Sequence, residues 1–251
     1  MPSTHPPERA SPRVLIGTAG WSITRAVGER FPGAGSQLAR YAARLAAVEI
    51  NSSFYRPHRP ATYARWAEST PATFRFAVKL PRAITHDARL ARAGPPLDVF
   101  LAEAGALGQR LGALLVQLPP SFAYEGRVVG RFLAALRDRW AGAVVLEPRH
   151  ASWFTAAVSE RLAARRIARV AADPARVPEA AEPGGDRSVV YYRLHGSPRI
   201  YWSRYDEAFL DALAARLRTH LEEADRVWCI FDNTASGAAI ENALALEERV
   251  G

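Results

Sequence analysis

Short apolar runs alternate with longer stretches of helical periodicity along almost the whole chain. The runs are rich in β-branched residues and are bounded by turn residues, which is typical of buried strands. Eight such runs occur: Val14–Gly17, Val48–Asn51, Phe74–Lys79, Ala113–Leu118, Ala143–Glu147, Ile167–Ala171, Val189–His195 and Val227–Asp232. Most are separated by stretches rich in Ala, Leu and Arg whose apolar residues recur at helical spacing, such as residues 60–68 and 209–221. The pattern predicts strands that alternate with helices.

Strand–helix alternation of this kind predicts parallel βαβ units. Eight units in 251 residues favour a single closed (β/α)8 TIM barrel over an open sheet, because such barrels typically use about 250 residues. Residues 174–187 are rich in Pro and Gly, so we expect an irregular loop instead of a helix between strands six and seven. We therefore predict a flexible N-terminal tail over residues 1–13 and one TIM-barrel domain over residues 14–251.

Composition narrows the class of protein. Hydrophobic residues make up 49% of the chain and charged residues 23%, which excludes an intrinsically disordered protein. No apolar run approaches the ~20 residues of a membrane helix, and the first 13 residues lack the apolar core of a secretory signal. The single cysteine, Cys229, excludes an internal disulfide and a zinc site built on several thiolates. We expect a cytoplasmic globular protein with no membrane partner and no obligate protein partner.

The basic residues are unusual in kind. The formal net charge is +8, and Lys79 is the one lysine among 33 Lys and Arg residues. Codon usage in a GC-rich genome accounts for arginine in place of lysine, whereas the net excess favours anionic partners such as phosphates or nucleic acid. A lysine that survives in such a chain is a better candidate for a site residue than any single arginine.

Ionisable and amide residues stand at or just beyond most of the predicted strand ends. In a barrel, the active site is built at these carboxyl ends, and residues two apart on a strand face the same side. Glu49 therefore shares a face with Asn51, and Arg193 shares a face with His195. We predict acid–base residues at Glu49, Glu147 and His195. The predicted ligand-binding residues are Trp21, Asn51, Tyr55, Lys79, Arg82, His86, Gln117, Arg149, His150, Arg193, Tyr201, Asp232 and Asn233.

Several sequence blocks resemble those of the YecE-like family of TIM-barrel proteins. The blocks are Gly17-Thr-Ala-Gly-Trp21, Val48 to Tyr55, Phe76 to Arg82 with Thr85-His86, Gln117-Leu-Pro-Pro120, Glu147-Pro-Arg-His150 with Trp153, Tyr192 to Gly196, and Phe231-Asp-Asn-Thr234 with Gly237 and Asn242-Ala243. They run in the family's order from about residue 14 to residue 246. The resemblance implies a TIM barrel and marks the site without implying a reaction. The family often has asparagine where Asp232 stands, which weakens any mechanism that requires a carboxylate there.

Three functions remain open from the sequence. Lys79, Arg82, Arg193 and His195 could capture a small anionic or phosphorylated ligand beside the acid–base pair. Arginines interleaved with aromatic residues on the loops could instead bind nucleic acid without catalysis.

The third function is that of a metal-dependent sugar isomerase or lyase, in which the carboxylates and His195 would hold a divalent ion. Positive side chains at the same carboxyl end of the barrel (its mouth) would repel a divalent ion. We therefore predict no cofactor and no native metal. We expect Lys79 to act as a charged clamp rather than to form a Schiff base, and Cys229 to lie in the core.

Overall fold

The computed structural model describes residues 12–251 and contains a ten-stranded sheet. The strands are β1 (Val14–Ala19), β2 (Ala47–Ile50), β3 (Arg75–Lys79), β4 (Leu111–Gln117), β5 (Val144–Glu147), β6 (Ile167–Arg169), β7 (Ala171–Asp173), β8 (Gly184–Gly185), β9 (Val189–Leu194) and β10 (Arg226–Phe231). Their order in the sheet is β7-β9-β10-β1-β2-β3-β4-β5-β6-β8. All neighbouring strands are parallel except β6 and β8, so the sheet is mixed.

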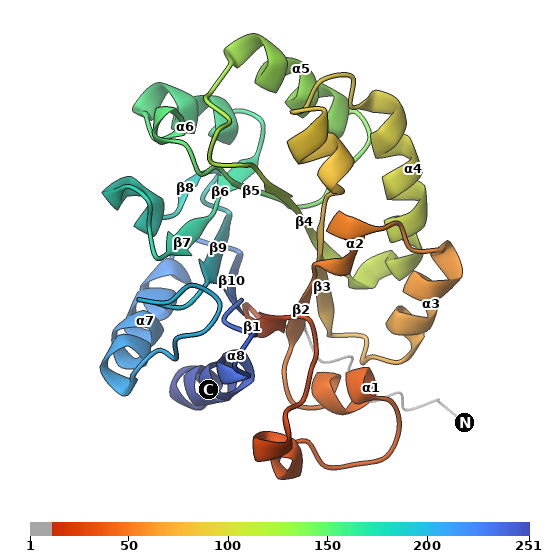
Figure 1. Cartoon of the computed structure of the whole chain (residues 1–251), viewed down its shortest axis with the longest axis vertical. Coiled ribbons are helices and arrows are strands. Elements are labelled where there is room, and N and C mark those ends of the chain that lie inside the picture. The colour runs from red at the N-terminus through yellow and green to blue at the C-terminus, as the bar shows by residue number, and fades with distance from the viewer. Residues whose placement is uncertain (1–11) are drawn as a thin grey trace, which may run out of the picture.

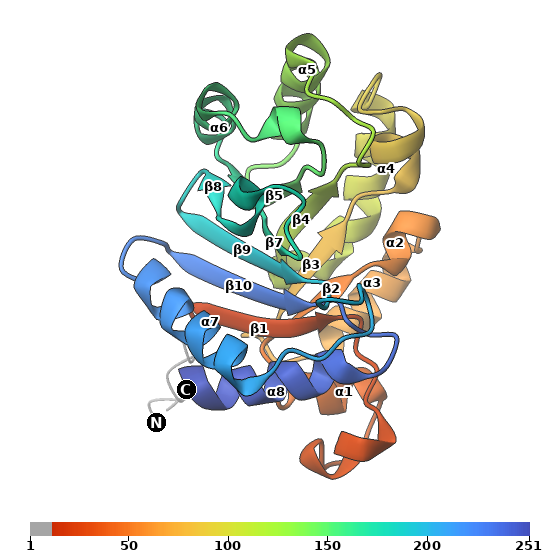
Figure 2. The ribbon, with the colours of Figure 1, turned by 60° about the vertical axis from the view of Figure 1, so that its left-hand side comes forward.

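The sheet curls into a nearly closed barrel. Only Val170 separates β6, which pairs with β5, from β7, which pairs with β9. The strands near the two ends of the strand order, β6 and β7, are therefore consecutive in the chain, at residues 167–173. Figure 2 shows β1, β9 and β10 running side by side with their arrowheads at the same end. The predicted α/β class is confirmed, and the sheet is barrel-like.

Helices surround the sheet (Figure 1). They are α1 (Gln37–Ala42), α2 (Ser52–Tyr55), α3 (Pro60–Glu68), α4 (Gly94–Ala104), α5 (Gly126–Arg137), α6 (Ala156–Ala163), α7 (Glu207–His220) and α8 (Ala238–Val250). Residues 174–187 form a short 3-10 helix (Pro178–Ala181) and β8, with no α-helix among these described residues. The irregular connection expected there is present.

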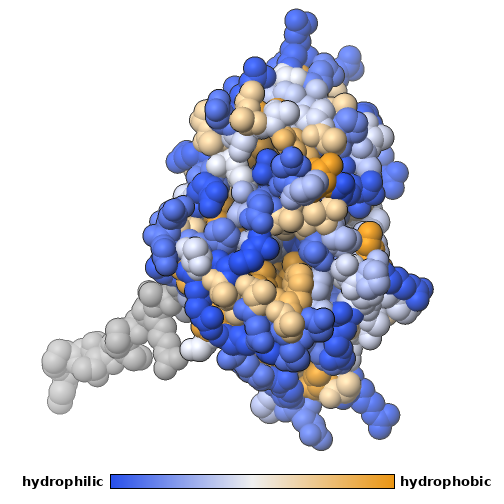
Figure 3. Space-filling view, turned by 90° about the vertical axis from the view of Figure 1, so that its left-hand side faces the viewer, coloured by the Kyte–Doolittle hydropathy of each residue, from blue (hydrophilic) through white to orange (hydrophobic). Residues whose placement is uncertain are grey.

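Helix α7 shows why these segments are helical and where they pack. Its buried residues recur at helical spacing, at Leu210, Leu213, Ala214 and Leu217, which gives one apolar stripe toward the sheet. The Asp206 side chain accepts a hydrogen bond from the Phe209 N–H at 2.8 Å and caps the first turn. Arg216 and Arg218 lie on the exposed face. Figure 3 looks onto the side that carries α6 and α7, and shows a mostly hydrophilic surface with smaller hydrophobic areas.

Strand alternation divides the core into two apolar clusters. One cluster fills the barrel interior with Leu15, Ala47, Ala77, Ala113, Leu115, Val145, Ala168, Val170, Tyr191, Trp228 and Ile230. The other lies between the sheet and the helices and includes Val48, Ile50, Phe76 and Val78. Trp228 fits the interior because Gly112 lies against it, where an added Cβ would come within 2.7 Å of the indole. Interior residues thus alternate with helix-facing residues, as the sequence pattern predicts.

Two expectations concern the ends of the chain and membranes. The predicted tail, residues 1–13, lies outside the described residues except for Pro12 and Arg13. The Arg13 guanidinium donates hydrogen bonds to the carbonyl oxygens of Leu221 at 2.5 Å and Ala224 at 2.7 Å. Within residues 12–251, none of the helices is long and apolar enough to cross a membrane.

Candidate functional site

Polar side chains gather at the carboxyl end of the barrel interior. Glu49, Lys79, Glu147 and Arg193 each stand two residues beyond an interior residue of the same strand, which aims them into the mouth. His195 and Asp232 follow β9 and β10 directly. Gln117 of β4 lies beside them. The seven side chains of this cluster are all buried: Glu49, Lys79, Gln117, Glu147, Arg193, His195 and Asp232. The structure therefore brings the central predicted residues together in one cluster.

Arg193 occupies the centre of this cluster and is fully buried, with 0% of its surface exposed. Its Nε and Nη2 donate to Glu49 Oε2 at 3.0 Å and Oε1 at 2.6 Å, a bidentate pair. Nη1 donates to Glu147 Oε2 at 2.6 Å, and Nη2 also donates to Asp232 Oδ2 at 3.1 Å. The Tyr191 hydroxyl donates to Glu49 Oε2 at 2.9 Å. One guanidinium thus joins three carboxylates, and Glu49 faces inward.

His195 lies between two of these carboxylates. Its Nδ1 is 3.0 Å from Asp232 Oδ2, and its Nε2 is 3.1 Å from Glu147 Oε1. Burial alone would lower the pKa of His195, but the Glu147 carboxylate and the hydrogen bond with Asp232 outweigh it and raise the pKa above 6.5. Burial opposes ionisation of Glu147, yet Arg193 and His195 hold its pKa well below the ordinary value. The arrangement favours an imidazolium between two ionised carboxylates.

Gln117 completes the environment of Glu147. Its Nε2 donates to Glu147 Oε2 at 3.0 Å, the same oxygen that accepts from Arg193. Both Glu147 oxygens therefore have partners, because Oε1 faces His195. The carboxylate is held in one orientation.

Lys79 is buried, with 8% of its surface exposed, yet no carboxylate among residues 12–251 lies within ion-pair distance of its ammonium. Its Nζ lies 4.3 Å from the centre of the Phe54 ring, a cation–π contact. Ser53 Oγ donates to the Lys79 carbonyl oxygen at 2.7 Å and fixes the end of β3. Burial and the nearby Arg193 guanidinium lower the pKa of Lys79 from 10.5 to about 8. The nearby carboxylates Glu49 and Glu147 are paired with Arg193 instead.

Two other groups at this end of the barrel, on Asn51 and Arg149, have no hydrogen-bond or ion-pair partner among residues 12–251. The Asn51 Oδ1 atom is buried without a hydrogen-bond partner. Arg149 is half-buried and forms no hydrogen bond or ion pair with the described residues. Burial, followed by Lys79 and the neighbouring arginines, lowers the pKa of His86, which places several positive groups on this side of the mouth.

A pocket of about 140 Å³ opens beside His195. Its lining includes Glu147, Arg149, Arg176 and Ile200. Arg176 is exposed, and it too forms no ion pair with the described part of the chain. The pocket therefore joins the imidazole to two free guanidinium groups.

Side-chain hydrogen bonds support the loop that follows β9. The Gly196 N–H donates to Tyr205 Oη at 2.9 Å, and Tyr205 Oη donates to Asp173 Oδ1 at 2.8 Å. The Asn242 side chain accepts from the Tyr205 N–H at 3.1 Å and from Asn233 Nδ2 at 3.0 Å. Gly196 has φ +92, and a Cβ there would lie 2.9 Å from a backbone oxygen. The predicted residue Asn233 thus supports the loop.

Tyr201 projects from this loop over the site. Its ring centre lies 6.0 Å from that of His195, edge to face. Ile200, Tyr201 and Trp202 are each at least 40% exposed, and the Arg199 guanidinium lies 4.4 Å from the centre of the Trp202 ring. The loop supplies an exposed aromatic rim next to His195.

Four predicted residues make other contacts. Trp21 packs edge to face on Trp66 at 5.1 Å, and Tyr55 is 78% exposed. The exposed Arg82 pairs with Asp87 at 3.1 Å. His150 Nδ1 accepts from the Ser152 N–H at 3.2 Å and caps a short 3-10 helix, Ala151–Trp153. The structure does not bring these side chains into the buried cluster.

Tyr191 and Asn242 also support the site, a role that the sequence pattern did not identify. The signal for Tyr191 was available, because strand alternation places it on the same face as Arg193. Asn242 lies within α8, far from the strand ends in sequence, and its role depends on how α8 packs against the loop after β9. Pattern alone could not have shown that role.

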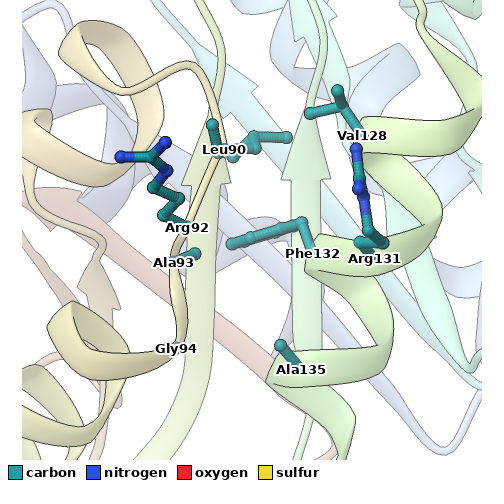
Figure 4. A pocket seen from close by; sticks show the side chains of 9 residues that line it. Leu90, Arg92, Ala93, Gly94, Val128, Arg131, Phe132 and Ala135 are labelled. Atoms are coloured by element: carbon teal, nitrogen blue, oxygen red, sulfur yellow. The ribbon is translucent and has the colours of Figure 1, made fainter.

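A larger pocket, of about 420 Å³, lies outside the barrel between the segment before α4 and helix α5 (Figure 4). Its lining is mainly apolar, with Leu90 and Phe132 on its walls and Arg92 and Arg131 at its edges. It contains no carboxylate or imidazole among its lining residues. This pocket therefore offers neither of the two side-chain types proposed for acid–base chemistry.

Comparison with known proteins finds one family along nearly the whole chain. The profile of the family described as "Protein of unknown function DUF72" matches residues 15–251. UPF0759 protein YecE of Escherichia coli K12 is 32% identical over 127 residues, which cover 50% of this chain and 46% of that protein. The chain thus aligns with about half the length of that relative. UPF0759 protein YunF of Bacillus subtilis 168 is 22% identical over 267 aligned positions, which cover 94% of each.

Solved structures share the fold. A DUF72 family protein from Enterococcus faecalis V583 superposes with a TM-score of 0.79 at 21% identity, covering 94% of this chain and 95% of that one. A DUF72 family protein from Thermotoga maritima MSB8 superposes with a TM-score of 0.78 at 24% identity, covering 94% and 98%. At these identities the likeness shows the fold alone.

Proposed function

The chain belongs to the DUF72 family, which the YecE-like motifs indicated, and we propose that it binds a small phosphorylated ligand at its barrel mouth and acts on it by acid–base chemistry. The observation that carries the proposal is the surplus of positive groups without protein partners at this mouth. Lys79 and Arg149 have no carboxylate within ion-pair distance among residues 12–251. A buried charge without an ion-pair partner is costly. The ligand would supply a partner to each of these groups, its phosphate to Arg149 and an oxygen at its other end to Lys79.

We assign a positioning role to the most deeply buried part of the cluster. Arg193 and Glu49 are fully enclosed and bind each other, so we assign them to positioning and not to direct ligand contact. Arg193 holds Glu147 and Asp232 in place, and these two carboxylates raise the pKa of His195, which favours its charged form. A charged imidazole next to an anionic ligand is suited to donate a proton. His195 is the proposed general acid.

The proposal places the site on a TIM barrel. We interpret β6 and β7 as one strand interrupted at Val170, which gives eight parallel strands and leaves β8 as a short addition paired antiparallel with β6. In such barrels ligands bind at the carboxyl ends of the strands. The buried cluster lies at that end.

A divalent metal does not fit the cluster well. Such ions are held by carboxylate oxygens, and here Arg193 already bonds to Glu49, Glu147 and Asp232. Among residues 12–251, no group of three or more His, Cys, Asp or Glu side chains is placed to hold a metal ion. The guanidinium occupies the position between the carboxylates that the ion would take, so no step of the proposal uses a metal.

A nucleic-acid ligand is the second candidate, favoured by the exposed rim aromatics Tyr55, Tyr201 and Trp202. Such side chains can stack on bases while arginines neutralise phosphates. Binding of a single-stranded oligonucleotide with a steep salt dependence, unchanged by Glu147→Gln, would favour this binding function.

The proposed function is tested by titrating the protein with ribose 5-phosphate and with ribose in a calorimeter. We expect binding that requires the phosphate and weakens by roughly tenfold or more in Lys79→Met and in Arg149→Met, because a charge-assisted hydrogen bond contributes about 1.5–3 kcal/mol. Arg149 would donate such a bond to the phosphate, and Lys79 to an oxygen at the other end of the ligand. Arg131→Met, on the exposed face of α5, is the matched control and keeps the wild-type affinity. Equal affinity in all four proteins would overturn the proposal.

A further inference from the structure

We infer that Lys79 is a covalent residue whose Nζ condenses with the carbonyl carbon of a small phosphorylated aldehyde or ketone to form an imine. The inference rests on the proposed function, since the same mouth binds the phosphate. It departs from our expectation of a charged clamp, because Glu49 and Glu147 are bonded to Arg193 and leave the Lys79 amine without an ion pair.

The position of Lys79 suits a nucleophilic amine. The side chain is buried at the end of β3, on the interior face of the barrel, with the Phe54 ring 4.3 Å from Nζ. No carboxylate within ion-pair distance stabilises its charged form among the described residues. Burial and Arg193 accordingly lower the pKa of the amine to about 8, so a useful fraction is neutral near neutral pH.

The sequence supports the same chemistry independently. Lys79 is the one lysine in a chain whose other basic side chains, apart from histidine, are arginines. If the site required only a positive charge, arginine would serve as it does elsewhere in the chain. An amine can form an imine with a carbonyl group, whereas a guanidinium stays protonated. A retained lysine therefore points to chemistry that needs the amine.

The surrounding groups complete the reaction. The neutral amine attacks the carbonyl carbon, and the C–O π electrons move to oxygen, which takes a proton from the His195 imidazolium. The imidazole takes one proton back from Nζ and gives it to the hydroxyl group, which leaves as water as the carbon–nitrogen double bond forms. Nζ then passes its second proton to His195, which restores the imidazolium. The balance is one amine plus one carbonyl to one imine plus one water, with the His195 proton returned. Asp232 and Glu147 hold the imidazole in place for these transfers.

The cations beside the cluster define the ligand class. Arg149 and Arg176 line the pocket of about 140 Å³ that opens next to His195. A phosphate bound there would direct the other end of a short ligand toward His195. We therefore assign the carbonyl to Lys79 and the phosphate to the two arginines, which selects phosphorylated over unphosphorylated carbonyl compounds.

Borohydride trapping tests the inference with dihydroxyacetone phosphate as the probe and dihydroxyacetone as its unphosphorylated match. A reduced imine becomes a secondary amine that blocks tryptic cleavage after Lys79, so mass spectrometry would find the adduct on the uncleaved peptide of residues 76–82. The α-amino group of the chain, the other type of primary amine present, serves as an internal reference. We expect trapping at Lys79 to be at least tenfold faster with the phosphorylated probe, and to be reduced by Arg149→Met.

The variant Lys79→Arg separates this inference from the proposed function, because it keeps the positive charge and removes the amine. We expect Lys79→Arg to bind ribose 5-phosphate within about threefold of the wild type and to lose all trapping on residues 76–82. Absence of an adduct at Lys79 in the wild type, with ribose 5-phosphate affinity still dependent on Arg149, would overturn the imine and leave the phosphate site. Trapping at Lys79 that is no faster with the phosphorylated probe than with dihydroxyacetone would also overturn the inference. Loss of phosphate-dependent affinity altogether would overturn the proposed function.

Discussion

The positive charge of Lys79 destabilises the folded protein, and replacing Lys79 with methionine removes this charge. The folded protein lowers the pKa of Lys79 from 10.5 to about 8 through burial and the nearby Arg193. At about 1.4 kcal/mol per pH unit, this shift corresponds to roughly 3 kcal/mol of instability while the amine is charged. Methionine retains most of the aliphatic stem and its contact with Phe54. We therefore expect Lys79→Met to raise the free energy of unfolding by about 1–3 kcal/mol at pH 7, as substitution of functional residues often does.

The pH dependence gives this prediction its sign. Between pH 8 and 10.5 the unfolded chain binds more protons at Lys79 than the folded chain, so the wild type gains stability there and the advantage of the variant declines. Urea denaturation followed by tryptophan fluorescence at pH 7 and pH 10 measures both values. Arg82→Met, at an exposed ion pair, is a control that we expect to change stability by less than about 0.5 kcal/mol. A variant that is destabilised at pH 7, or whose advantage is the same at both pH values, would refute the reasoning.

Three further predictions concern the buried groups. Glu49→Gln leaves Arg193 with one buried carboxylate fewer, and we expect denaturation to show a loss of about 3–5 kcal/mol; a loss below about 1 kcal/mol would contradict the ion pair. The raised pKa of His195 stabilises the fold fully below pH 6.5, and this contribution is lost as the pH rises through the folded value. The stability difference between the wild type and His195→Asn should therefore shrink in alkaline buffer, and a constant difference would count against the imidazolium. Burial raises the pKa of the Cys229 thiol, so an aromatic disulfide reagent should label it only after unfolding; rapid labelling of the folded protein would show that the strand is open.

The positions of the strands and the direction of their side chains could be predicted from sequence because the interior of this barrel follows a strict alternation. Ala77 and Val145 are interior residues, so Lys79 and Glu147 must point the same way. The helix predicted over residues 60–68 has those bounds in the structure, since Pro60 fixes its first turn. The break between β6 and β7 at Val170 could not be predicted from the sequence, because the sixth apolar run continues through it without a change in residue type.

The pairing of charges could not be predicted in the same way. Alternation places Glu49, Lys79, Glu147 and Arg193 at one mouth, but it does not say which cation takes the carboxylates. That choice depends on side-chain reach and burial in the assembled barrel, where the planar guanidinium of Arg193 bonds to both glutamates. Lys79 is left without them, and our inference that it acts as an amine depends on this pairing.

The central claim, that the mouth binds a phosphorylated ligand through cations left free by the protein, is tested most directly by a crystal structure in the presence of ribose 5-phosphate. The account predicts a phosphate within hydrogen-bond distance of Arg149 and the sugar end of the ligand directed toward His195 and Lys79. A mouth that stays closed by an ion pair between Lys79 and Glu147 or Asp232, with the ligand bound elsewhere or not at all, would contradict it.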